Sequence, residues 1–112
     1  MRSVFILVCD DRDHDSGEVR NIAAFEDEAV ADALAAQLDT IAQAYTQADL
    51  AYTREHKQHH PNRRALEHKA CEDMAALLVQ YPDAEIHRDY DPPRLCIDVM
   101  AAGFTVQELK VH

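Results

Sequence analysis

Three aspartates at alternating positions are the first candidates for chemistry in this 112-residue chain. The segment Asp11-x-Asp13-x-Asp15 has the spacing with which a calcium-binding EF-hand loop begins. The match fails further on, because that loop needs glycine at its sixth position and glutamate at its twelfth, where this chain has Ser16 and Ile22. A solvated acidic hairpin loop explains the same aspartates, and so does a negatively charged docking surface.

Histidine, cysteine and glutamate side chains form a second cluster near the middle of the chain. His68, Cys71 and Glu72 are three and four residues apart and would share one face of a helix. Two helices packed antiparallel would bring His56 to the same face, and these four side chains are of types that bind zinc. The chain has no metal signature such as HExxH. A metal site is therefore an alternative to a polar helical end with solvated histidines.

The residues typical of covalent or nucleotide-dependent catalysis are few. Cys9 and Cys96 lie in apolar runs, where a free cysteine usually packs as an inert side chain. Ser16 has no GxSxG context, and two glycines are too few for a phosphate-binding loop or a dinucleotide fingerprint. We therefore expect a protein that is not an enzyme and that needs no cofactor.

Acidic residues dominate the charge of this chain. Asp and Glu number 21 against 11 Lys and Arg, which leaves a formal charge of −10. This charge argues against generic binding to nucleic acid or to anionic membranes, and it suits a basic protein partner. The charge is segregated, because residues 10–49 carry −9 whereas residues 54–69 carry +3. Acidity kept for solubility alone explains the total equally well, but not the segregation.

Two acidic segments are the predicted contact regions for such a partner. One is the polar stretch after residue 9, and the other surrounds Tyr90, which an Asp91-Pro92-Pro93 turn should expose. Carboxylates on a rigid scaffold can imitate phosphate charge and occupy a groove lined by lysine and arginine. The predicted partner-binding residues are Asp10, Asp11, Asp13, Asp15, Glu18, Asp89, Tyr90 and Asp91.

Hydropathy and cysteine usage indicate the compartment. The apolar run Val4–Cys9 has six residues, whereas a signal sequence needs about 7–15 and a membrane span about 20. Three cysteines are an odd number without zinc-like spacing, which disfavours an even disulfide framework. We expect a cytoplasmic protein that does not enter a membrane.

The hydrophobic patterns predict a single α+β domain over residues 1–112 with the order ββααββ, or with a fifth strand in the C-terminal part. Apolar or alternating runs predict strands at residues 4–9, 19–25, 85–90, 95–100 and 104–111. Acidic residues at 26–28 and Pro61 bound a long helix, Glu26–His60, with Asp39-Thr40 as a point where it could divide. A second helix is predicted at residues 62–80. An antiparallel sheet, made of an N-terminal hairpin and C-terminal strands, should pack on this helical pair.

The length of the first helix suggests a further alternative. More than thirty residues without Gly or Pro exceed what a domain of this size needs, and part of the apolar stripe could pair with a second copy. Besides a protein-binding inhibitor and a metal-binding domain, a third hypothesis is therefore an accessory or structural domain that forms a homodimer through its long helix.

The first third of the chain also resembles a known class of small proteins in its order of elements and composition. A strand, a polar turn and a second strand lead into Ala24-Phe25-Glu26-Asp27-Glu28-Ala29-Val30-Ala31. This arrangement, in a small acidic chain without Trp, resembles phage and mobile-element proteins of the anti-CRISPR type. The resemblance implies a stoichiometric inhibitor that occupies a basic surface on a nuclease, a helicase or a nucleic-acid-guided complex. It rests on no shared motif, so it assigns no functional residue.

Overall fold

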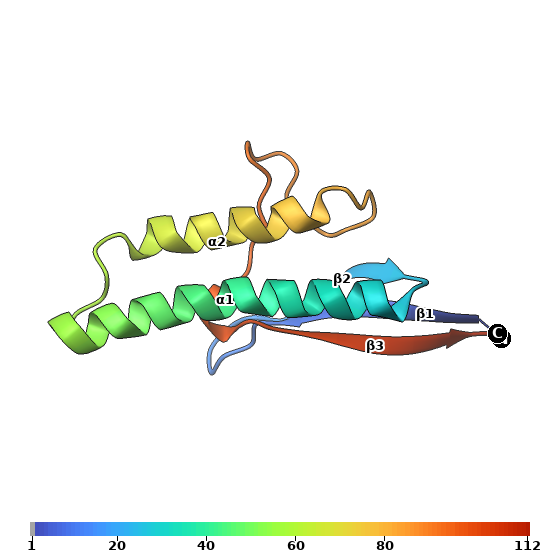
Figure 1. The fold of residues 1–112 in the computed structure, drawn as a ribbon, viewed down its shortest axis with the longest axis horizontal. Helices are drawn as coiled ribbons and strands as arrows, with labels where there is room; N and C mark the ends of the chain where they lie inside the picture. The colour runs from blue at the N-terminus through green and yellow to red at the C-terminus, as the bar shows by residue number, and fades with distance from the viewer. Residues whose placement is uncertain (1) are drawn as a thin grey trace.

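A three-stranded antiparallel sheet packed against two helices makes up the fold (Figure 1). The computed structural model describes residues 2–112. The strand order in the sheet is β2-β1-β3, and the chain order is ββααβ. The elements are β1 Arg2–Asp10, β2 Val19–Phe25, α1 Glu28–His56, α2 Arg63–Leu78 and β3 Gly103–Val111. The predicted α+β class and antiparallel sheet are confirmed, with one regular C-terminal strand where the sequence predicted two or three.

The central strand β1 explains the continuous apolar run at the N-terminus. It pairs with β2 from Phe5 opposite Phe25 to Asp10 opposite Val19. On its other side, β1 pairs with β3 along its whole length. A strand with neighbours on both sides is the most protected part of a sheet, and Leu7, Val8 and Cys9 are all buried.

Helix α1 is a single unbroken helix of 29 residues, so the break considered at Asp39-Thr40 does not occur. The Asp27 carboxylate caps its start by accepting the Ala29 N–H. The helix ends at His56, several residues before Pro61, because Lys57 adopts a left-handed conformation at φ 54°. No helix in the described residues 2–112 is long and apolar enough to cross a bilayer.

One apolar core lies between the sheet and the helices. The sheet contributes Leu7 and Ile22, and these two side chains are at most 1% exposed. Leu38 of α1 and Met74 of α2 are fully buried in the same cluster, with α1 packed on the strands and α2 packed on α1. Leu34 and Tyr45 of the apolar stripe on α1 are buried in this core, whereas Ala33, Ala44 and Ala48 are exposed, so the homodimer hypothesis stays a prediction.

The segment between α2 and β3 differs from the sequence prediction. Residues 85–90 and 95–100 were predicted to be strands, but they form one isolated bridge, His87–Arg94, and a short 3-10 turn, Val99–Ala101. Leu95 and Val99 alternate with exposed or half-buried neighbours as in a strand, and both are buried. Their backbone finds other partners, since the Leu95 N–H donates to the Cys71 carbonyl of α2. The alternation of apolar and polar residues here therefore arises from an extended segment with one side buried, and not from a strand paired in the sheet.

Candidate functional site

Asp11 is the first residue of the hairpin loop that joins β1 and β2. Its Oδ1 accepts the Glu18 N–H at 3.0 Å, and its Oδ2 accepts from Arg20 at 3.0 Å and from the Asp98 N–H at 2.9 Å. Burial by itself raises the pKa of Asp11, but these hydrogen bonds outweigh it and hold the pKa below its usual value. Asp11 is only 2% exposed, and its hydrogen bonds join both ends of the loop to the segment around Asp98.

The other acidic residues of this loop are exposed or half-buried, and most of them bond within the loop. Asp10 pairs with Arg12 at 2.8 Å. Asp13 accepts the N–H groups of Asp15 and Ser16 at 2.9 and 2.8 Å, which makes a local turn. Each such contact reduces the charge that the loop presents to a partner.

Glu18 is also paired, with Arg20 at 2.7 Å, and Arg20 thus lies between the carboxylates of Glu18 and Asp11. The loop is tightly folded at Gly17, whose φ is +95°. The hairpin loop is therefore a rigid structure, held by its own aspartates and glutamate.

The second predicted contact region is a projecting loop, residues 87–94, which we name the tip loop (Figure 1). Its base is closed by two backbone hydrogen bonds between His87 and Arg94, at 2.8 and 3.2 Å. The Arg94 guanidinium stacks 3.9 Å above the centre of the Tyr90 ring. Tyr90 is 45% exposed, and the flanking Asp89 and Asp91 are exposed as well.

Arg88 fastens the tip loop to the end of α2. Its guanidinium donates to the Val79 carbonyl at 3.2 Å and to the Tyr81 carbonyl at 2.7 Å. This arginine is therefore oriented toward the fold, while Asp89 and Tyr90 remain accessible. Tyrosine contributes a large, rigid contact area at low entropic cost, which is why it is enriched among residues that dominate protein interfaces.

A cleft of about 290 Å³ lies between the hairpin loop and the base of the tip loop. We name it the acidic cleft, and its lining residues are Glu18, Arg20, Glu85, Ile86, His87, Leu95 and Cys96. The carboxylates of Glu18 and Glu85 are both exposed. Glu18 is paired with Arg20, which also pairs with Asp11, whereas Glu85 forms no ion pair within residues 2–112. Glu18 of the hairpin loop and His87 of the tip loop both line this cleft. The other predicted contact residues lie outside its lining: Asp10, Asp11, Asp13, Asp15, Asp89, Tyr90 and Asp91.

Sequence reasoning did not assign Glu85, His87 or Cys96 to this site. No local pattern marks them, because the cleft exists only where the C-terminal segment crosses the start of β2. The Glu85 N–H donates to the Ile22 carbonyl at 2.7 Å, and the Asp98 N–H bonds to Asp11 across 87 positions of sequence.

The predicted metal ligands are not brought together. His56 stacks on Tyr52, with ring centres 4.1 Å apart, whereas Cys71 faces the core and is 5% exposed. Burial raises the pKa of the Cys71 thiol to about 11, which opposes the thiolate form that binds zinc. His68 and Glu72 gain no third ligand, since no group of three His, Cys, Asp or Glu side chains in residues 2–112 could hold a metal ion. The same holds for Asp11, Asp13 and Asp15.

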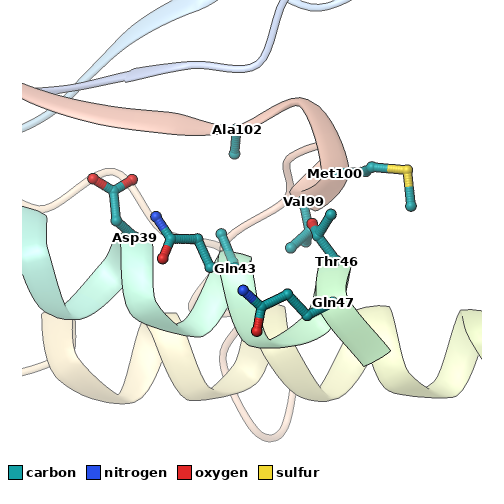
Figure 2. A pocket seen from close by; sticks show the side chains of 8 residues that line it. Asp39, Gln43, Thr46, Gln47, Val99, Met100 and Ala102 are labelled. Carbon is teal, nitrogen blue, oxygen red and sulfur yellow. The ribbon is translucent and has the colours of Figure 1, made fainter. Parts of the chain in front are cut away.

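A second cavity, of about 260 Å³, lies between α1 and the 3-10 turn before β3 (Figure 2). Figure 2 shows Asp39, Gln43 and Gln47 extending from α1 on one side of it. Asp39 is its only charged residue, and its Oδ1 accepts the Phe104 N–H at 3.0 Å. This contact joins α1 to the start of β3, so the charge of Asp39 serves the fold.

Comparisons of this chain with protein-family models, curated proteins and solved structures found no match.

Proposed function

We propose that this protein is a non-enzymatic inhibitor that binds a basic nucleic-acid-binding partner, such as a nuclease, a helicase or a nucleic-acid-guided complex, in the cytoplasm. The observation that carries the proposal is the acidic cleft beside the exposed Tyr90 of the tip loop. The resemblance to proteins of the anti-CRISPR type points to the same class of activity. Occupying the partner's cationic surface would exclude nucleic acid from it.

Charge complementarity supports this role. A lysine or arginine of the partner fits the acidic cleft, where it would pair with Glu85 and share Glu18 with Arg20. The Tyr90 ring, stacked near His87 of the cleft, offers an apolar surface. The formal charge of −10 would attract a basic partner over distance and speed association at low salt.

Rigidity supports it as well. Internal hydrogen bonds hold the hairpin loop through Asp11 and the tip loop through Arg88 and the His87–Arg94 bridge. A partner then meets a surface that is already ordered, and binding loses less conformational entropy.

Affinity capture from the native host, with the purified protein as bait, tests the proposal. The wild type should capture a basic nucleic-acid-binding protein, release it as salt rises, and inhibit its activity on nucleic acid at a one-to-one ratio. The double variant Glu18→Gln/Glu85→Gln and the single variant Tyr90→Ala should each lose most of the capture.

A matched control removes the same number of charges elsewhere. Glu28 and Glu55 are exposed acids on α1, and the variant Glu28→Gln/Glu55→Gln should capture the partner as the wild type does. Equal capture by the cleft variant, or a partner that remains bound without inhibition, would contradict the proposal.

A further inference from the structure

Strand β3 is the open edge of the sheet. Of the two edge strands, β2 is partly covered, because its Ile22 carbonyl accepts the Glu85 N–H. The outer side of β3 is occupied at its start, where Asp39 takes the Phe104 N–H. In an antiparallel pair, successive residues alternate between facing the neighbouring strand and facing outward. The N–H groups of Val106, Glu108 and Lys110 therefore point outward in the same direction as that of Phe104.

The last part of β3 exposes both its backbone edge and its side chains. Residues 107–111 are all exposed, including Leu109 at 55% and Val111 at 42%. Leu109 pairs with Val4 on the sheet face away from the core, whereas Glu108 pairs with Phe5, which packs against the core. An uncovered strand edge with exposed apolar residues is a template for another strand.

The charges of β3 are complementary to a second copy of the same strand. If two β3 strands pair antiparallel with Leu109 opposite Leu109, Glu108 of each copy lies opposite Lys110 of the other. Shifting one strand by two residues along the other, in either direction, places Glu108 opposite Glu108 or Lys110 opposite Lys110. Opposite charges directly across two strands are stabilising and like charges are destabilising, so the first register is selected.

Asp32 of α1 adds a second acidic group at this edge. It lies seven residues before Asp39 on the same helix face, and α1 runs antiparallel to β3 (Figure 1). Seven helix residues and three strand residues both span about 10 Å, so Asp32 lies level with Gln107 when Asp39 lies level with Phe104. In the selected register, Lys110 of the second copy meets this region as well as Glu108.

We propose that two copies of this chain associate through β3 in this register and form one six-stranded antiparallel sheet. The two-fold axis passes between the Leu109 residues, and the outward N–H and C=O groups of Glu108 and Lys110 bond across it. The hairpin loop lies at the other end of the sheet from the end of β3 (Figure 1). Glu18 of that loop lines the acidic cleft, so this interface and the proposed partner site are separate.

Charge reversal tests the register. Sedimentation of the wild type from micromolar to millimolar concentration should show a monomer–dimer equilibrium. Glu108→Lys and Lys110→Glu should each weaken dimerisation about tenfold or more, because each places two like-charge pairs across the axis. The double variant Glu108→Lys/Lys110→Glu should restore it. An equimolar mixture of the two single variants should form a heterodimer, although each variant alone dimerises weakly.

Reversal of an ion pair away from the edge provides the control. Lys69 and Asp73 pair on the surface of α2, and Lys69→Glu/Asp73→Lys should dimerise as the wild type does. A wild type that stays monomeric at millimolar concentration would overturn the proposal. Single variants that dimerise as the wild type does would also overturn it, and would assign the contact to the apolar sheet face. A double variant that does not regain dimerisation, although its circular dichroism matches that of the wild type, would overturn it as well.

Discussion

Asp49 and Arg63 face each other across the interface of α1 and α2, with Oδ2 of Asp49 3.7 Å from Nε of Arg63. Asp49 is 2% exposed, and among the described residues its Oδ1 has no hydrogen-bond partner. One turn earlier on α1, the Tyr45 hydroxyl bonds to Glu67 of α2 at 3.3 Å. Polar contacts thus set the register of the two helices where the apolar core thins out.

Removing Arg63 should destabilise this interface. The variant Arg63→Met leaves the Asp49 carboxylate buried without a cation, and we expect a loss of about 2 kcal/mol in the free energy of unfolding. The value lies below that of a fully buried pair because 39% of the Arg63 side chain is exposed. Urea denaturation followed by circular dichroism measures it. The neighbouring, exposed Arg64→Met should change stability by less than about 0.5 kcal/mol, and equal effects of both variants would contradict this account.

Asp11 should make the fold sensitive to acid. Its pKa is lowered in the folded protein, so its ionised form stabilises the fold above the unfolded value of about 3.9. This contribution is lost as the pH falls through the lower, folded value. Asp11→Asn should reduce stability by about 1–2 kcal/mol at pH 7 and flatten the decline below pH 4. Urea midpoints measured between pH 7 and pH 2.5 test it, and parallel pH profiles of variant and wild type would refute the assignment.

Gly17 should not tolerate a side chain. Its φ is +95°, and a Cβ at this position would lie 2.3 Å from the Asp11 carbonyl oxygen. Gly17→Ala should therefore destabilise the fold by about 2 kcal/mol or more. Gly103 provides the matched control, because a Cβ there meets nothing within 4 Å, and Gly103→Ala should be neutral or slightly stabilising. Thermal melting of both variants distinguishes them, and a stable Gly17→Ala would show that the loop has another conformation.

The three thiols should differ in reactivity. Burial raises the pKa of Cys9 to about 12 and that of Cys71 to about 11, whereas Cys96 is exposed in the acidic cleft. Because the thiolate is the reactive form, a disulfide reagent at pH 8 should modify one thiol quickly in the native protein and three after denaturation. The variant Cys96→Ser should lose the fast phase. Rapid modification of two native thiols would show that one of the buried cysteines is accessible.

Much of the local structure could be predicted from the residues alone. The apolar run Val4–Cys9 and the segment Val19–Phe25 are strands, and the acidic start at Asp27 does begin a long helix. These features depend on near neighbours in the chain, because side-chain periodicity and helix capping are local interactions. The strand predicted over residues 95–100 was wrong, because an extended segment packed against a helix shows the same alternation of apolar and polar residues as a strand.

The candidate site could be predicted only in part. Tyr90 was expected to be exposed and is, because the Pro92-Pro93 turn lies next to it. Asp11 looked identical to Asp13 in the sequence, yet Asp11 is buried against Asp98 and Asp13 stays at the surface. Which carboxylate remains available to a partner depends on which donors surround it, and those donors come from distant parts of the chain.

The amino-acid sequence was enough to predict the two N-terminal strands, the last strand and both helices. It also shows the excess and the segregation of negative charge, and the residue types that a binding surface could use. Three features follow only from the folded structure: which charges are paired, the cleft that Glu18 and Glu85 line together, and the position of β3 at the edge of the sheet. The physical reason is the range of the interactions. Helix and strand preferences act over a few residues, whereas burial, ion pairing and strand neighbours depend on contacts between segments that only folding brings together.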